Sequence, residues 1–448
     1  MTDNLTKLTD NIYLSRRKKL LKNIKSEAAI FISNPETVMT RDQHHPYHHA
    51  SDIFYLTGFS EPETALVLLG GNRGPRSILY LRDKDPVDER WNGDRLGIKS
   101  AKRRFQIDEV RDIKHFIKDL PELLATTRTL HYSPGINLKY DQAIWNLFST
   151  SVGPRLNFPT TLKDARLLTS ELRFIKDKFE IDTISHAVDI TIKGIGKIIR
   201  EIPNLKSEVF AAKLLEAYFV EHGASGSSFN TIVASGKNST ILHHNPKKST
   251  IWNKDLLLID AGALYCGYAG DITRTVPASG KFSQAQAAVY DIVHAALKNG
   301  IALAKPNSCL DDVHLATVRA ITRGLVDLKI LKGNVNDLIA NGAYKKYYMH
   351  RSGHWLGIDV HDISPITVST PNSNDIFMPA NIRPFVPGNV FTIEPGIYID
   401  ARDQTVPAAY RGIGIRIEDD VLITNSGCKV LSDKLPTERN ELEDFMSY

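Results

Sequence analysis

The chain has 448 residues, of which 42% are hydrophobic and 24% charged, and its formal net charge is +5. This composition argues against broad disorder, and the length exceeds what one hydrophobic core usually supports, so we expect two domains. No apolar run approaches the roughly 20 residues needed to span a bilayer, no secretory signal is expected, and the modest charge without a basic motif argues against nucleic acid as a partner.

The first third of the sequence is typical of a compact α/β domain, which we assign to residues 1–175. The basic run Arg16–Lys19 leads into apolar residues and predicts a solvated amphipathic helix. Helical spacing recurs around Asp108–Leu124. Short apolar runs bounded by turn-rich stretches predict buried strands at Ala28–Ser33, Ala65–Gly70, Ser77–Arg82 and Thr129–Ser133.

The remaining residues, 176–448, combine helices with strands that carry carboxylates. A stripe of isoleucines predicts a helix over Phe179–Ile202, and Ser207 is a plausible N-cap for a second helix that ends before Gly223. Pro365–Pro387 is rich in Pro, Asn and Ser and predicts a long loop that would narrow the mouth of a cleft. Further helices are expected at Ser283–Leu303 and Leu310–Leu331, and strands at Leu256–Asp260, Asp271–Val276, Val390–Glu394 and Gly412–Thr424.

The cysteines are few and widely spaced. Cys266, Cys309 and Cys428 form no paired pattern, so neither a disulfide framework nor a zinc knuckle is expected. A reducing compartment, the cytoplasm, is the simplest interpretation.

Two aspartates lie on the arms of a predicted hairpin. If its turn is centred on Tyr265 and Cys266, Asp260 and Asp271 are direct cross-strand partners on one face. Two ionised carboxylates this close in an apolar setting repel, so either one takes up a proton or a cation lies between them. A proton-sharing aspartyl dyad is the rival interpretation.

Two glutamates repeat this pattern. Glu394 ends an apolar strand, and Glu418 alternates with isoleucines on the same face as Arg416. Each carboxylate taken singly is more often part of a buried salt bridge than a metal ligand. Four such carboxylate-bearing strands in one domain favour a shared metal site over separate salt bridges.

Histidines supply the other ligand chemistry. His350, His354 and His361 fall within twelve residues, and His243 and His244 form an earlier pair. Oxygen-rich sites with few imidazoles suit Mn²⁺, Co²⁺ or Fe²⁺ better than structural zinc, and Zn²⁺ is the remaining candidate for a catalytic ion. The four carboxylates and one imidazole make five ligands, too many for one catalytic ion that must keep open positions. Two ions are therefore expected, with Mn²⁺ preferred.

These residues, in this order, resemble the creatinase/methionine-aminopeptidase ("pita-bread") metallopeptidases, and within them the aminopeptidase P group. The strings IDAGALYCGYAGDITRT, HRSGHWLGIDVHD, EPGIYI and YRGIGIRIEDD carry the resemblance. His45–Tyr47, Ser51–Phe59 and Glu89–Gly93 extend it into the first domain. It implies an α+β chain: a C-terminal pita-bread fold with a smaller N-terminal α/β domain that contributes to substrate access and oligomer contacts.

The resemblance also implies the activity. The chain would be an Xaa-Pro aminopeptidase that releases the first residue of peptides with proline in second position, by a hydroxide bridging two divalent ions. Asp260 would chelate one ion, Asp271 and Glu418 would bridge both, and His354 with Glu394 would complete the second. Glu394 would also shuttle a proton.

Second-shell roles follow from the same resemblance. His243 and His361 would bind substrate and stabilise the tetrahedral intermediate, and His350 would be a further catalytic and pocket residue. Arg416 would orient the carboxylates. Trp91 and Tyr398 would contact substrate. His244 would be a spectator beside His243. For the imidazoles of His44, His45, His48 and His49, a structural or cleft role is favoured over a third metal.

Two alternatives remain. A prolidase would cut Xaa-Pro dipeptides alone with similar ligands, and a non-catalytic pita-bread protein would bind without hydrolysis. The resemblance further implies a homodimer or homotetramer in which one subunit's N-terminal domain walls another's cleft.

Overall fold

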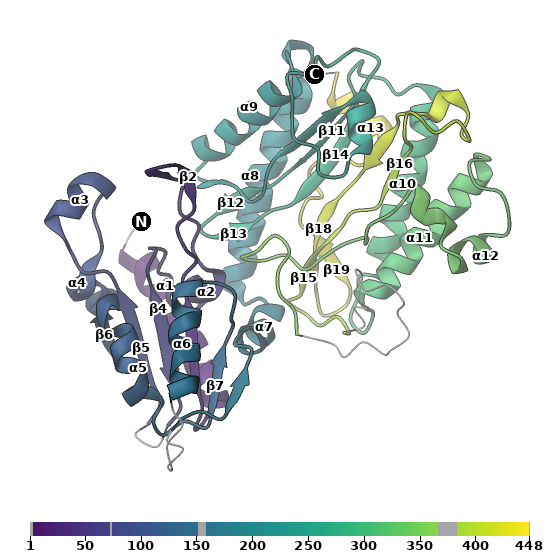
Figure 1. The fold of residues 1–448 in the computed structure, drawn as a ribbon. Helices are drawn as coiled ribbons and strands as arrows, with labels where there is room; N and C mark the ends of the chain where they lie inside the picture. The colour runs from purple at the N-terminus through teal and green to yellow at the C-terminus, as the bar shows by residue number, and fades with distance from the viewer. Residues whose placement is uncertain (1–2, 72–73, 151–157, 366–382, 448) are drawn as a thin grey trace. The chain divides into compact units, whose positions relative to one another are not determined.

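The computed structural model describes residues 3–71, 74–150, 158–365 and 383–447, and the chain divides into two compact units, Met1–Leu172 and Arg173–Tyr448 (Figure 1). Most of the long loop predicted at Pro365–Pro387 lies outside the described residues. Within the described part of the chain, no helix combines the length and the apolar character needed to cross a bilayer.

The N-terminal unit is built on a sheet with the strand order β6-β5-β4-β1-β7-β8. β1 pairs antiparallel with β4 and parallel with β7. Alternate residues of these strands pack against α5 and α6 in one core. The strands are β1 (Ala28–Ile32), β4 (Ala65–Leu69), β5 (Arg76–Leu81), β6 (Glu109–Asp112), β7 (Thr129–Tyr132) and β8 (Thr161–Lys163), with a separate hairpin of β2 (Val38–Thr40) and β3 (Gln43–His44).

The helices of this unit correct the prediction of a helix that begins at Asp108. They are α1 (Asp3–Asn23), α2 (Ser51–Thr57), α3 (Pro86–Asn92), α4 (Gly97–Arg104), α5 (Phe116–Leu124), α6 (Leu138–Thr150) and α7 (Arg166–Phe174), which ends in the other unit. The helix expected from Asp108 starts only at Phe116, because Glu109–Asp112 pairs with β5.

The basic run on α1 is not fully solvated. Arg16 and Arg17 are 3% and 1% exposed, and their guanidinium groups donate to the carbonyls of Tyr55 and Leu56 in the last turn of α2. Such carbonyls lack partners within their own helix and attract cations. Arg16 and Arg17 are therefore buried structural residues that hold α1 against the end of α2.

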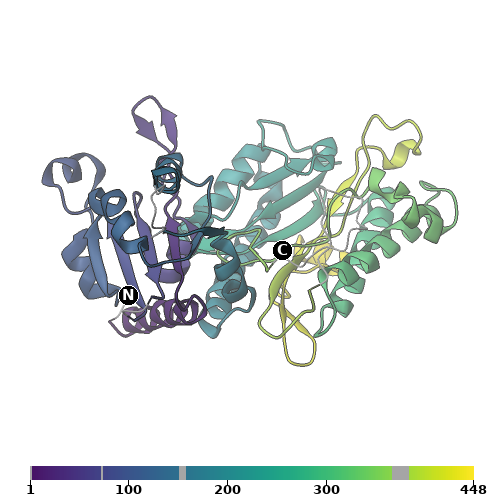
Figure 2. The same ribbon diagram turned by 60° about the horizontal axis from the view of Figure 1, so that its bottom comes forward.

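In the C-terminal unit, helices flank short sheets. Figures 1 and 2 show α8 and α9 on one side of the strands and α10 and α11 on the other. The predicted N-cap Ser207 accepts from Phe210 N, and Ser283 forms a capping box with Gln286. The helices are α8 (Lys178–Glu201), α9 (Glu208–Glu221), α10 (Gln284–Leu303), α11 (Leu310–Asp327), α12 (Val335–Ala340) and α13 (Arg439–Phe445).

The strands of this unit form small sheets with the orders β10-β11-β14, β13-β12-β9, β15-β18-β19 and β16-β17. An isolated antiparallel bridge joins Thr273 to Glu418, the residue before the strand Asp419–Ile423. The run predicted as one strand at Gly412–Thr424 is broken at Ile417 and Glu418. The strands are β9 (Gly226–Ser227), β10 (Ile232–Ser235), β11 (Leu256–Ala261), β12 (Ala263–Tyr265), β13 (Tyr268–Ala269), β14 (Ile272–Pro277), β15 (Val390–Ile393), β16 (Gly396–Tyr398), β17 (Gly414–Arg416), β18 (Asp419–Ile423) and β19 (Cys428–Val430).

The register of the aspartate hairpin differs from the prediction. Tyr265 pairs with Tyr268, so the turn is Cys266–Gly267, and both turn residues have positive φ (47° and 81°). This is the backbone of a type I′ turn, which favours glycine. Moving the turn centre by one residue pairs Asp260 with Thr273 in place of Asp271. Because the offset is two residues, Asp271 stays on the same face.

Candidate metal centre

Strand ends and one loop bring the five predicted ligands of the C-terminal unit together. Asp271, His354 and Glu418 each offer a ligand atom, and these atoms lie within 4.8 Å of one another. His354 Nε2 lies 3.4 Å from Asp271 Oδ2 and 3.8 Å from Glu394 Oε1. Asp260 is close enough for its charge to act on Asp271, Glu394 and Glu418.

The carboxylates carry more negative charge than the protein compensates. Burial raises the pKa of Asp271 and of Glu418 well above the usual range, and the neighbouring carboxylates raise both further. Burial also raises the pKa of Glu394 to about 7, although His354 and Arg416 oppose the shift. Without a cation these groups would hold protons near neutral pH, whereas divalent ions would stabilise them ionised.

His354 presents the nitrogen that a metal needs. Its Nδ1 lies 3.1 Å from the Trp355 carbonyl oxygen, which only accepts, so Nδ1 carries the proton. Nε2 therefore keeps its lone pair and faces the carboxylates. A backbone carbonyl that fixes the tautomer is a common partner of ligating histidines.

One buried oxygen in the centre lacks a protein partner. Asp260 Oδ1 accepts no hydrogen bond from the described residues. An ionised carboxylate oxygen left bare in a buried site is costly. An imidazole nitrogen with a free lone pair and an oxygen-rich donor set fit divalent first-row metal ions.

Arg416 connects the ligands. It donates to Asp260 Oδ2 and, over 2.9 Å, to Tyr398 Oη. Its Nε lies 3.3 Å from Thr273 Oγ1, which donates to Glu418 Oε2 over 2.7 Å. Thr273 was missed by the sequence reasoning. The available signal was its position two residues after Asp271, on the same face of the strand.

His350 has a defined proton position. Its Nδ1 donates to the Arg351 carbonyl over 2.7 Å, and its Nε2 lies 2.9 Å from Tyr398 Oη. Burial lowers the pKa of His350 to about 3, with Arg416 lowering it further, so the ring is neutral and Nε2 accepts from Tyr398. Both ring nitrogens thus already have protein partners.

His361 and His243 lie beside these ligands. The ring of His361 lies over that of His354, with centroids 4.0 Å apart and an interplanar angle of 31°. Burial lowers the pKa of His361 to about 4, and the charges of His354 and His243 lower it further. His243 is exposed and also acts on the pKa of His350. The His361 imidazole is therefore neutral where it lies against the His354 ring.

Other singled-out residues lie outside this cluster. Trp91 is on α3 of the N-terminal unit and is 85% exposed. His244 is buried and pairs with Glu208 over 2.9 Å, a structural contact. His48 stacks on His49, which stacks on Phe54. In the part of the chain that the structure describes, no metal-competent group besides Asp271, His354 and Glu418 is found.

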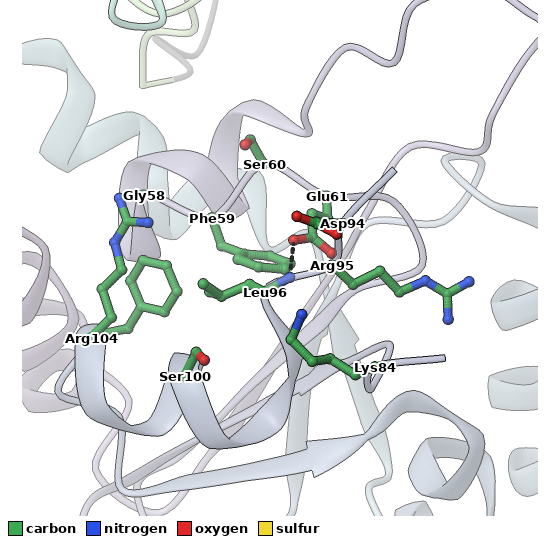
Figure 3. Close-up of a pocket in the computed structure, with 11 residues that line it drawn as sticks. Gly58, Phe59, Ser60, Glu61, Lys84, Asp94, Arg95, Leu96, Ser100 and Arg104 are labelled. Atoms are coloured by element: carbon green, nitrogen blue, oxygen red, sulfur yellow. Dashed lines mark hydrogen bonds between the residues drawn. The ribbon is translucent and has the colours of Figure 1, made fainter. Parts of the chain in front are cut away.

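A hollow of about 450 Å³ lies in the N-terminal unit (Figure 3). Phe59, Glu61, Arg95 and Arg104 are among its lining residues, and Leu96 N donates to Glu61 Oε1 over 2.9 Å. Arg95 is already paired with Asp88. None of the predicted ligands or site histidines lines this hollow, so it is distinct from the metal centre.

Comparison with known proteins agrees with the two-unit architecture. Residues 182–425 match "Metallopeptidase family M24", and residues 13–131 match "Aminopeptidase P, N-terminal domain". The chain is 37% identical to the Xaa-Pro aminopeptidase of Haemophilus influenzae, with 99% of each chain covered. It superposes on Escherichia coli aminopeptidase P with the inhibitor Pro-Leu at a TM-score of 0.89, 35% identity and 98% coverage of both chains. A zinc-substituted form of that enzyme with product gives the same values.

Proposed function

The chain belongs to metallopeptidase family M24 and carries the N-terminal domain of aminopeptidase P, and from this premise we propose how its residues perform the reaction. It has the pita-bread fold and is a metal-dependent exopeptidase, an Xaa-Pro aminopeptidase. The prolidase and non-catalytic alternatives are not favoured, because relatives named Xaa-Pro aminopeptidase match over nearly the whole chain. The observation that carries the site assignment is the convergence of buried carboxylates on His354.

Asp260, Asp271, His354, Glu394 and Glu418 would hold two divalent ions. Mn²⁺ is the proposed metal, since four carboxylates and one imidazole make an oxygen-rich set. Such ions supply Lewis-acid activation of a peptide carbonyl and of water. Arg416, through Asp260 Oδ2 and Tyr398 Oη, keeps the carboxylates and the neighbouring tyrosine oriented.

The side chains around the ions would handle protons and substrate. Glu394, whose Oε2 lies 3.6 Å from His350 Nδ1, would carry a proton toward the leaving nitrogen. That nitrogen belongs to proline and has no N–H, so clefts that bind a backbone amide fit it poorly. His243 and His361 would donate to the substrate carbonyl as its charge develops. His350 and Tyr398 would contact substrate at the same wall.

The N-terminal unit, residues 1–175 in the sequence-based division, would shape substrate access and subunit contacts. Trp91 is the candidate residue that one subunit contributes to another's cleft in a homodimer or homotetramer. Trp91 is 85% exposed and lies near the exposed Val87 on α3, and exposed large apolar groups that lie together commonly mark an interface. The cytoplasm is the proposed compartment, supported by the three unpaired cysteines.

A metal titration tests this assignment. Protein stripped by a chelator is assayed with Mn²⁺, Co²⁺, Fe²⁺ or Zn²⁺ on Xaa-Pro-Xaa tripeptides and on Xaa-Pro dipeptides. We expect Mn²⁺ to restore the most activity, with release from tripeptides; cleavage of dipeptides alone would identify a prolidase. Asp271→Asn should lower the activity by at least about 100-fold, which is the upper range for changes to residues that only support metal ligands. Asp291→Asn, on the outer helix α10, is the matched control.

A further inference from the structure

The loop that carries His354 and His361 closes on itself. Asp362 N donates to the Trp355 carbonyl over 2.8 Å, and Gly357 N donates to the Asp359 carbonyl over 3.1 Å. This closure places the two imidazole rings against each other at 4.0 Å. The position of His361 therefore depends on how firmly the loop is held at its C-terminal end, residue 362.

A buried group of charges lies at that end. The carboxylate of Asp362 is 1% exposed and pairs with Lys176 Nζ over 2.9 Å and with Arg173 Nη2. The same Arg173 nitrogen lies 2.6 Å from Asp359 Oδ2. In these contacts two cations face two carboxylates. Removing one member of a buried ion pair leaves an uncompensated charge and is strongly unfavourable.

The two cations are themselves fixed. The side chains of Arg173 and Lys176 are 2% exposed. The backbone between them is tied to the start of β15, because Lys176 N donates to the Gly388 carbonyl over 2.9 Å and Asn389 Nδ2 donates to the Phe174 carbonyl over 2.7 Å. Arg173 and Lys176 are therefore a rigid anchor for Asp362.

The loop is shaped around this contact. A Cβ at Gly357 would lie 2.1 Å from Asp362 Oδ2 and 3.2 Å from Lys176 Cε. No residue with a side chain fits there while the ion pair is formed. The turn after His354 and the ion pair beside His361 therefore form one packed unit.

We propose that Arg173, Lys176 and Asp362 are positioning residues that hold His361 in register with His354 for the reaction. None of them touches the substrate or the metal ligands in this scheme; they act through the backbone at Asp362. Two charge-assisted bonds to one carboxylate fix its orientation more firmly than neutral bonds would. The inference rests on the role proposed above for His361.

The test is a double-mutant cycle between Lys176→Met and His361→Ala in the full-length, metal-loaded enzyme. Alone, Lys176→Met should lower kcat/KM by about 10- to 100-fold, the range for lost outer-shell support. In the His361→Ala background, Lys176→Met should lower kcat/KM by no more than about twofold, because the residue that Lys176 positions is already absent. Metal content should stay at the wild-type level. Lys281→Met removes an exposed cation from Glu443; it controls for the loss of a lysine charge and should be neutral in both backgrounds.

The outcomes separate the two claims. An equal loss from Lys176→Met in both backgrounds, or no loss in either, would overturn the positioning role while leaving that of His361 intact. Full activity of His361→Ala would overturn the proposed role of His361 and this inference with it. If Lys176→Met does not fold, Lys176→Met/Asp362→Asn enters the same cycle, because it removes one charge of each sign and leaves Arg173 balanced by Asp359.

Discussion

At the scale of single residues, the pKa of Glu394 gives the candidate metal centre a testable pH dependence. Its side chain is 18% exposed, and its pKa is raised by burial from 4.5 to about 7. Between these two pH values the folded, metal-free protein holds a proton that the unfolded chain has released. The contribution of Glu394 to the free energy of unfolding of the metal-free protein must therefore fall as the pH rises through that window. Bound cations would remove the effect by stabilising the ionised form.

Comparing wild type with Glu394→Gln in the presence of a chelator tests this behaviour. Glutamine has the same shape and does not titrate, so the variant should become the more stable protein as pH rises from about 4.5 to 7, by something on the order of 2 kcal/mol. Thermal unfolding at several pH values measures the difference.

The control is Glu441→Gln, an exposed carboxylate of α13. It should track wild type at every pH. A difference between wild type and Glu394→Gln that is independent of pH would show that the carboxyl does not hold a proton in the metal-free protein.

At the scale of elements, the aspartate hairpin depends on a close approach of two strands. Gly270 N donates to the Ala263 carbonyl over 3.0 Å, and Ser228 Oγ donates to the Gly270 carbonyl over 2.9 Å. A Cβ at Gly262 would lie 1.6 Å from that Gly270 carbonyl oxygen. The glycine is what lets the strands carrying Asp260 and Asp271 run this close together.

Gly262→Ala should therefore force the arms apart. We expect a loss of about 3 kcal/mol in the free energy of unfolding, the upper range for overpacking, measured as a lower urea midpoint. Mn²⁺ affinity should fall as well, because Asp260 and Asp271 separate. Gly427→Ala, where a Cβ meets nothing within 4 Å, is the control. Wild-type metal affinity in Gly262→Ala would contradict the close-approach argument.

At the scale of the whole molecule, α3 offers an exposed apolar face. Val87 and Trp91 are 72% and 85% exposed. They are four residues apart and so lie on one side of the helix. Exposed large apolar groups that lie together commonly mark an interface.

Trp91→Ala should weaken assembly if this face meets another subunit. Truncating an interface tryptophan typically costs about 2 kcal/mol or more, so the dissociation constant should rise at least about tenfold. Sedimentation velocity over a concentration series measures it, with Trp145→Ala on α6 as the control. A wild-type chain that stays monomeric at all concentrations would rule out the proposed homo-oligomer.

The sequence by itself predicted the candidate ligands and their order, the N-cap at Ser207, the helix that begins near Ser283, and the apolar strands that carry or flank the carboxylates, because these depend on local spacing and chemistry. The tertiary structure decided what depends on groups distant along the chain. It set the Asp260–Thr273 register, buried Arg16 and Arg17 against α2, and fixed the tautomer of His354. It also brought Arg173 and Lys176 to Asp362, 186 residues beyond Lys176. The local sequence pattern does not predict such contacts, because they join residues that are far apart along the chain. Each forms because a polar group that is buried on folding needs a partner.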